Sequence, residues 1–245
     1  MRPLRTDFVS AWLRGFAVQG SWNYRTLLGG GIAYSLLPLL RRVYAGDPVG
    51  LKTAVRRHLE SFNAHPYLCP MAVGALARLE AEGEEAEKIE RFRIAIRGPL
   101  GTLGDRLVWA TWRPVCLFVA ILLFAAGATP WVAALAFLGL YNSGHAALRI
   151  WGMRTGWLRG LRLGRALHDS WLDRVATALA PLNLLLLGAA TLALSLRIPH
   201  VADAGIPLAI GGASAALVAF RWPARGGKIA IGLLLAAPLV WLTLG

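Results

Sequence analysis

The sequence has little charge, little acid and almost no cysteine. Charged residues make up 16% of the chain, only 13 residues are acidic, and the two cysteines are Cys69 and Cys116. This composition is far from that of an ordinary soluble domain. Two cysteines in apolar surroundings exclude a disulfide framework and argue against a metal site, so we expect both to be small packing residues.

A cleavable secretion signal is also missing, because Arg2, Arg5 and Arg14 interrupt the first fifteen residues. We therefore expect the N-terminus to stay on the protein. Apolar residues recur there at helical spacing, at Phe8, Val9, Trp12, Leu13 and Phe16. The pattern indicates an amphipathic helix that lies on a membrane surface, on a partner, or on the rest of the chain.

Apolar residues are abundant: they make up 56% of the chain, and the mean hydropathy is +0.53. A soluble protein of this size cannot easily bury several apolar runs of about 17 to 21 residues, the length that crosses a bilayer. The sequence predicts an all-α integral membrane protein with about five transmembrane helices in residues 107–245. The expected spans are roughly 113–128, 131–148, 176–196, 205–220 and 229–244.

The net charge of +13 reports topology and not nucleic-acid binding, because basic residues bracket the apolar runs and form no stripe with interleaved aromatics. The linkers 149–175 and 221–228 carry six and three basic residues, whereas 129–130 and 197–204 together carry only Arg197. The positive-inside rule places the first pair of linkers in the cytoplasm and the C-terminus outside.

Residues 1–106 contain shorter apolar pieces, 27–40 and 67–79, which glycine and proline interrupt. Neither piece is long enough to span a bilayer alone. Such segments are typical of discontinuous or re-entrant helices, which line substrate sites in transporters. We therefore predict an N-terminal amphipathic and re-entrant region with cytoplasmic parts over 1–106, and a transmembrane region over 107–245. Buried helices of a cytoplasmic lobe are the other interpretation of the first region.

Three stretches occur in a specific order: QGSWNYRTLLGGGIAYSLLPLLRR (19–42), RRHLESFNAHPYL (56–68) and RGPLGTLGDRLVWATWRPV (97–115). A fourth, weaker stretch is LYNSGHAALRIWGMRTGW (140–157). Together they resemble the IID subunit of the mannose/fructose/sorbose family of bacterial sugar phosphotransferase systems. The resemblance is good over about residues 8–165 and rests on hydropathy elsewhere.

The resemblance implies a multi-pass subunit of the bacterial inner membrane that pairs with a IIC subunit as a trimer of heterodimers and carries a hexose inward. Phosphoryl groups in that family travel on IIA and IIB components, so it implies no enzyme activity and no cofactor here. The alternative is a non-transporting regulatory or scaffold subunit derived from this family. Arg106 and the short segment 197–205, which depart from the family pattern, suggest that alternative.

Asn63 and His65 are the first candidates for sugar binding, because sugar hydroxyls both donate and accept hydrogen bonds. Asn63 offers two donors and an acceptor, and neutral His65 adds one of each. Pro66 biases His65 toward an extended backbone, which points side chains away from a helix. A capping turn is the competing interpretation. We do not expect His58 or His65 to carry a phosphoryl group, although imidazole can act as a nucleophile.

Asp105 follows the glycine-rich stretch GPLGTLGD, whose backbone can turn tightly or approach a ligand closely. We expect Asp105 either to receive a sugar hydroxyl or to pair with Arg106 or Arg113. Arg113 opens the first span, where an unpaired charge is costly.

Two tryptophans, Trp22 and Trp112, are candidates for stacking on the sugar ring, and Asn23 lies beside Trp22 in the resembling turn. Tryptophan is also the ordinary residue of membrane interfaces. Asn142 and His145 lie three residues apart in the second span, where polar groups usually bind another helix, so we expect a helix contact there.

Asp169 and Asp173 support the one enzyme alternative. They lie one helical turn apart, and paired carboxylates there would suit the metal of a membrane phosphotransferase. Favourable charges at a helix N-terminus explain them adequately, so we predict no metal site.

Overall fold

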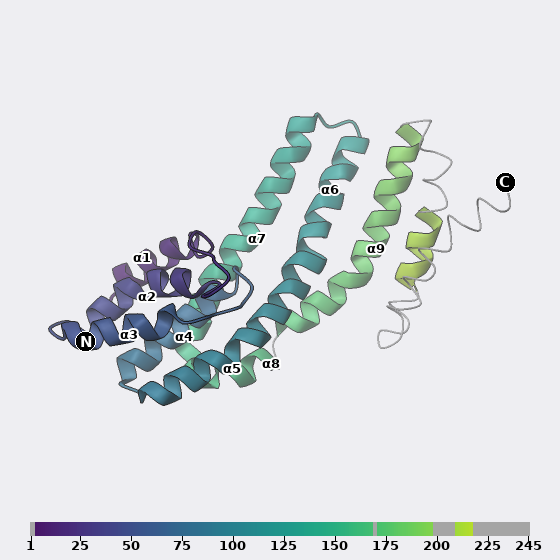
Figure 1. Ribbon diagram of the computed structural model, residues 1–245. Helices are drawn as coiled ribbons and strands as arrows, with labels where there is room; N and C mark the ends of the chain where they lie inside the picture. Colours follow the sequence, from purple (N-terminus) through teal and green to yellow (C-terminus); the bar gives the residue numbers. More distant parts are fainter. Residues whose placement is uncertain (1–2, 169–170, 198–208, 218–245) are drawn as a thin grey trace. The chain divides into compact units, whose positions relative to one another are not determined.

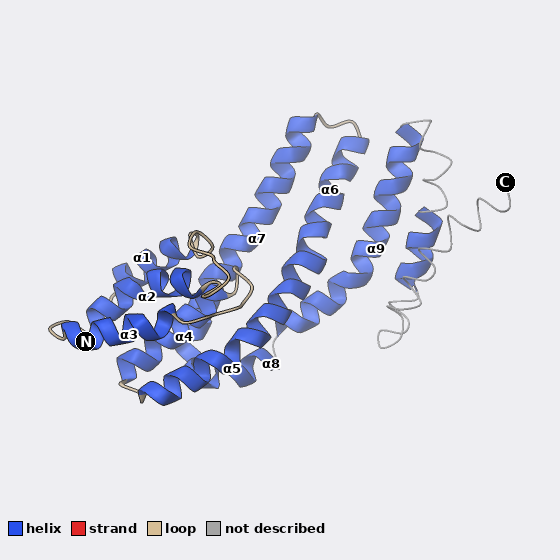
Figure 2. Cartoon of the chain, in the orientation of Figure 1, coloured by secondary structure: helices blue, strands red, loops and turns tan. Residues whose placement is uncertain are grey.

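The computed structural model describes residues 3–168, 171–197 and 209–217 (Figure 1). Regular structure in these residues is helical, apart from two isolated β-bridges (Figure 2). The elements in order are α1 (Arg5–Gly15), α2 (Gly29–Val43), α3 (Pro48–Leu59), α4 (Cys69–Glu82), α5 (Ala86–Gly104), a π-helix (Asp105–Trp112), α6 (Arg113–Ala125), α7 (Pro130–Arg159), a 3₁₀ turn (Gly160–Arg162), α8 (Leu163–His168) and α9 (Trp171–Arg197).

The chain divides into two compact units. The first unit comprises Met1–Asp105 and Gly144–Ser170, and the second comprises Arg106–Ser143 and Trp171–Gly245. The first unit therefore includes part of α7 and all of α8, which the sequence analysis assigned to the transmembrane region.

Helix α4 is the centre of the first unit. Its residues are apolar on nearly every face, and almost all of them from Cys69 to Glu80 are buried. A helix that is apolar all round needs neighbours on all sides, and α1, α2 and α5 supply them. Gly83, at φ +69°, ends α4 in the left-handed conformation that favours glycine.

The glycine triplet at the start of α2 allows backbones to touch. A Cβ on Gly29 would lie 2.2 Å from the Glu60 carbonyl oxygen, and one on Gly31 would lie 1.9 Å from the Val18 carbonyl oxygen. Both are far below any real contact distance. Helix α2 can therefore pack against the segments around Val18 and Glu60 only without side chains at these positions.

Prolines inside two helices leave carbonyl groups free, and side chains from other helices bind them. Pro38 has no N–H for the Tyr34 carbonyl four residues earlier, and Arg14 Nη1 of α1 donates to that oxygen at 3.3 Å. In the second unit Pro114, near the start of α6, has no N–H to offer the Ala110 carbonyl four residues earlier. The Nδ2 of a buried asparagine on α9, Asn183, donates to it at 3.3 Å and to the next carbonyl at 3.1 Å.

Two helical stretches of the described residues are long and apolar enough to cross a membrane, Ala86–Ala125 and Trp171–Arg197. The second ends on Arg197, which donates to the Phe124 carbonyl near the end of α6. These two stretches contain most of the expected span 113–128 and all of 176–196.

The other three expected spans are not among the two stretches that pass this test. Span 131–148 lies within α7. Span 205–220 is described only over 209–217, which is helical, and 229–244 lies outside the described residues.

Replacing Gly31 by alanine should destabilise the protein, because the new methyl group would meet the Val18 carbonyl. Overpacking of this kind costs about 1–3 kcal/mol. Gly164 of α8 is the matched control, because it is exposed, a Cβ there meets nothing within 4 Å, and no proline follows it. Gly164→Ala should be neutral or stabilise by up to about 1 kcal/mol, the usual gain of alanine over glycine in a helix. Thermal unfolding in detergent compares the two, and equal melting temperatures would contradict the packing.

Candidate functional site

The segment 60–68 between α3 and α4, here called the 60–68 loop, contains two of the expected sugar-binding residues. It lies beside the 22–28 segment, because the Leu28 N–H donates to the Phe62 carbonyl at 3.0 Å and the Phe62 N–H donates to the Thr26 carbonyl at 3.1 Å. The Phe62 side chain is fully buried. Backbone hydrogen bonds therefore join two of the resembling stretches.

Arginines of α5 hold the start of the loop. Arg93, only 1% exposed, donates from Nη2 to the Glu60 and Ser61 carbonyls, and its guanidinium lies 5.6 Å from the centre of the Phe62 ring. Arg97 Nη1 also donates to the Ser61 carbonyl, at 3.3 Å. Glu90 compensates the buried charge through Oε1, 3.1 Å from Arg93 Nη1. The carbonyls of Glu60 and Ser61 thus accept hydrogen bonds from arginine side chains.

His65 packs against the glycine-rich end of α5. A Cβ on Gly104 would lie 2.1 Å from His65 Cβ, and one on Gly101 would lie 3.9 Å from Ala64 Cα. His65 is 2% exposed, and its Nδ1 accepts the Tyr67 N–H at 3.2 Å. Burial, with smaller contributions from Arg149 and His145, lowers the pKa of His65 to about 4, so the ring is neutral at physiological pH.

Arg149 of α7 anchors the other side of the loop. Arg149 is 2% exposed. It donates from Nη1 to the Gly15 carbonyl at 2.5 Å and from Nε to His145. Its guanidinium lies 4.8 Å from the centre of the Phe16 ring and 5.2 Å from the centre of the Tyr67 ring. His145 stacks on Tyr67, with ring centroids 3.6 Å apart. Arg149 was not among the residues that we expected from the sequence. The only feature of the sequence that could have indicated it is its spacing of four residues from His145.

Asn23 closes the neighbouring turn with its own side chain. Its Oδ1 accepts the Arg25 and Thr26 N–H groups at 3.0 and 2.9 Å. Its Nδ2 donates to Thr26 Oγ1 at 2.7 Å and to the Ser21 carbonyl at 3.1 Å. Asparagine serves such turns well. The amide is therefore engaged in positioning the turn.

Three other expected residues of the first unit are exposed: Trp22, Asn63 and Asp105. Trp22 packs edge to face with Tyr24 at 4.8 Å. Asp105 directly follows Gly104, the glycine that touches His65. The first unit thus gathers all the expected sugar-binding residues except Trp112 on or beside the 60–68 loop.

Trp112 lies in the second unit, at the end of the π-helix. Its side chain as a whole is half-buried, but the Nε1 atom is fully buried and has no hydrogen-bond partner among the described residues. Arg106 and Arg113, which we expected as alternative partners of Asp105, have other contacts within the second unit. Arg106 Nη1 binds Asp173 Oδ1 at 2.6 Å, and the guanidinium of Arg113 lies 4.7 Å from the centre of the Trp109 ring.

The remaining polar candidates differ in their contacts. Asn142 is exposed, and its Nδ2 donates to the Leu138 carbonyl of its own helix at 2.8 Å. His145 contacts residues of two other segments, Phe16 and Tyr67. The described residues contain no group of three or more side chains able to hold a metal. Asp169 lies outside them.

A second buried polar cluster joins α3 to α4. Three side chains contact the carboxylate of Glu80. His58 Nε2 lies 2.7 Å from Oε1, and Arg57 Nη1 lies 3.6 Å from the same oxygen. The Tyr44 hydroxyl donates to Oε2 at 2.5 Å. Burial lowers the pKa of His58. Burial alone would raise the pKa of Glu80, but the His58 and Tyr44 hydrogen bonds lower it, so neutral His58 donates to an ionised carboxylate.

Comparison with known proteins identifies relatives over most of the chain. Residues 4–210 match the family described as "PTS system mannose/fructose/sorbose family IID component". The chain is 30% identical over 190 residues to the mannose-specific EIID component of Escherichia coli K12, which covers 76% of this chain and 66% of the relative. It is 27% identical over 195 residues to the fructose permease IID component of Bacillus subtilis 168, covering 77% and 69%.

Two solved structures are similar. One is the cryo-EM structure of the mannose transporter ManYZ in complex with microcin E492, with a TM-score of 0.61 and 27% identity over 78% of this chain and 70% of that one. The other, "Structure of membrane protein", has a TM-score of 0.69 and 28% identity over 77% and 70%. The expected all-helical membrane protein is confirmed, whereas the number of spans stays a prediction. The chain spans 66% of the length of the Escherichia coli relative.

Glu80→Gln should destabilise the protein by about 3 kcal/mol, because it leaves Arg57 and His58 without the carboxylate in a buried site. Since the folded state lowers the pKa of Glu80, its contribution is present above about pH 4.5 and is lost as the pH falls below that value. Thermal unfolding as a function of pH measures both effects.

The control for this prediction is Glu87→Gln, since Glu87 is exposed and pairs only at 3.7 Å with Arg91 on its own helix. It should change stability by less than about 0.5 kcal/mol. An unaltered melting temperature in Glu80→Gln at pH 7 would show that the cluster is not stabilising.

Proposed function

Because the chain belongs to the mannose/fructose/sorbose family of phosphotransferase-system IID components, we propose that it is a membrane permease subunit. Together with a IIC subunit it forms the path that binds and translocates a hexose, which the separate IIB component phosphorylates with a phosphoryl group from IIA. The pair assembles as a trimer of heterodimers and crosses the bacterial inner membrane several times.

The single observation that supports sugar binding by this chain is the gathering of the candidate residues at the 60–68 loop. The loop backbone is held by hydrogen bonds to the 22–28 segment and by Arg93, and His65 is packed on Gly104. A pre-ordered loop loses little freedom when a ligand binds. Such a loop suits recognition of a small polar substrate.

The described contacts divide the candidates into two roles. Asn63 is exposed and its amide has no hydrogen-bond partner among the described residues, so it can bind a hydroxyl group directly. Trp22 is exposed and can stack on the C–H face of a sugar. His65 and Asn23 act as positioning residues, because burial encloses the first and its own turn occupies the second.

Phosphoryl transfer on other components agrees with the environment of the histidines in this loop region. His58 is fully buried against Glu80, and His65 is 2% exposed against Gly104. A phosphoryl acceptor must meet its donor at the surface. Neither ring offers that access, which supports a transport role without catalysis.

Uptake of labelled hexose into vesicles tests the proposal, with this chain, the IIC partner, and the IIA and IIB components present. Asn63→Ala should lower uptake about tenfold, the loss expected for one hydrogen bond of about 1–1.5 kcal/mol. Assembly with the IIC subunit should remain intact, because the amide binds no described residue. Asp105→Asn should also lower uptake if the carboxylate receives a hydroxyl group.

Thr53→Ala is the matched control, because Thr53 is an exposed residue of the same unit and binds only the Val49 carbonyl of its own helix. It should leave uptake unchanged. Normal uptake in both Asn63→Ala and Asp105→Asn would remove these residues from the site. Absence of uptake by the assembled wild-type complex would contradict transport itself and favour a regulatory subunit, which the comparisons do not favour.

A further inference from the structure

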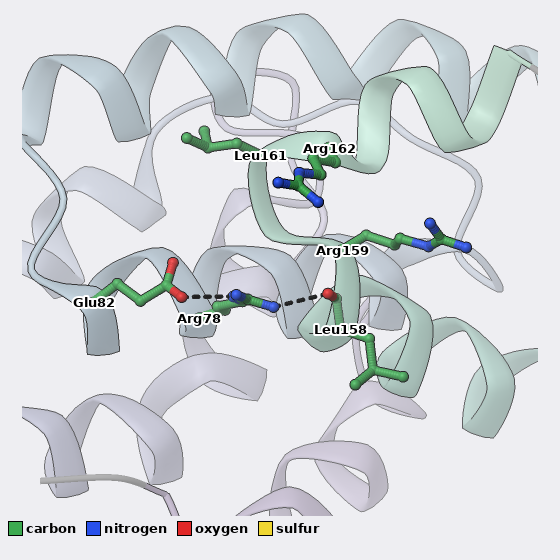
Figure 3. Close-up of a pocket in the computed structure, with 6 residues that line it drawn as sticks. All are labelled: Arg78, Glu82, Leu158, Arg159, Leu161 and Arg162. Atoms are coloured by element: carbon green, nitrogen blue, oxygen red, sulfur yellow. Dashed lines mark hydrogen bonds and ion pairs between the residues drawn. The ribbon is translucent and has the colours of Figure 1, made fainter.

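An open hollow of about 250 Å³ lies in the first unit, where the end of α4 meets the turn after α7 (Figure 3). Its lining consists of Arg78, Glu82, Leu158, Arg159, Leu161 and Arg162. None of these residues belongs to the 60–68 loop, and the proposed transport path does not use them. Its volume is below the roughly 300–1,000 Å³ of pockets that hold drug-sized ligands, so a headgroup-sized ligand fits better.

Arg78 is fixed at one side of the hollow. Its Nε donates to Glu82 Oε1 at 2.8 Å, and its Nη1 donates to the Leu158 carbonyl at 2.7 Å (Figure 3). The same Nη1 donates to the Trp157 carbonyl at 3.2 Å. Gly160 turns the chain here with φ +49°, and a Cβ on it would lie 3.1 Å from Arg78 Cδ. The Nη2 group of Arg78 has no partner among the described residues and remains available to a ligand.

The charge of the residues that line the hollow is not balanced. Arg159 and Arg162 are exposed, and neither forms an ion pair with a described residue. The lining thus contains three guanidinium groups and one carboxylate, Glu82, which Arg78 already binds. Two exposed apolar side chains, Leu158 and Leu161, line the same hollow.

We propose that this hollow, here called the arginine hollow, binds a phosphate group. Guanidinium groups match the oxygens of phosphate in charge and geometry, and arginine suits such ligands better than lysine. The group can come from the headgroup of an anionic phospholipid or from a free phosphate. The two leucines favour the lipid, because they offer apolar surface to the part of a lipid that adjoins its headgroup, and basic pockets of membrane proteins bind such headgroups.

Native mass spectrometry of the chain in complex with its IIC partner, delipidated in a neutral detergent, tests the proposal. Phosphatidylglycerol, phosphatidylcholine and inorganic phosphate are titrated separately. We expect phosphatidylglycerol to bind more tightly than phosphatidylcholine. The double variant Arg159→Gln and Arg162→Gln should bind phosphatidylglycerol about 25-fold more weakly, since each arginine near a lipid surface contributes about fivefold. Sugar uptake is not needed for this measurement.

Arg165→Gln is the matched control, because Arg165 is an exposed arginine of the same segment that does not line the hollow. It should retain wild-type binding. Saturable binding of inorganic phosphate that the double variant loses would support a free phosphate as the ligand. Equal affinity of wild type and double variant for both probes, or an equal loss in Arg165→Gln, would overturn the proposal. The single variant Arg162→Gln replaces the double variant if the latter does not assemble.

Discussion

Arginine side chains that bind carbonyl groups at, or directly after, the ends of other helices hold the first unit together. The pairs are Arg149 with Gly15, Arg93 with Glu60 and Ser61, and Arg78 with Trp157 and Leu158. Carbonyls at helix C-termini lack partners in their own helix and carry the negative end of the helix dipole. A guanidinium supplies both the donors and the charge. Each arginine therefore joins two helices at the point where one of them ends.

This constraint explains why a protein with a net charge of +13 buries cations. Burying Arg93 or Arg149 would be costly without partners, but carbonyl oxygens, aromatic rings and Glu90 surround them. The excess charge is thus partly structural. At the 60–68 loop it fixes the backbone on which Asn63 is displayed, so the rigidity of the proposed sugar site depends on arginines that need not touch the sugar.

Local patterns in the sequence predict much of this molecule. Helical segments, and glycines that permit close approach, follow from spacing and composition, and Gly104 lies against His65. Long-range partners do not follow from such patterns. Arg149 binds a carbonyl 134 residues away, and the Glu80 carboxylate binds His58 22 residues earlier. Only the fold determines which free carbonyl or carboxylate an arginine or histidine meets.

Hydrogen–deuterium exchange of the assembled complex tests the central claim most directly, in the wild type and in Arg93→Lys. Lysine keeps the charge but cannot bind two carbonyls with one planar group. If the guanidinium holds the loop, the amides of Phe62 and Leu28, which join the loop to its neighbour, should exchange at least tenfold faster in the variant, while those in the middle of α4 stay protected. Unchanged protection of Phe62 and Leu28 would contradict the account.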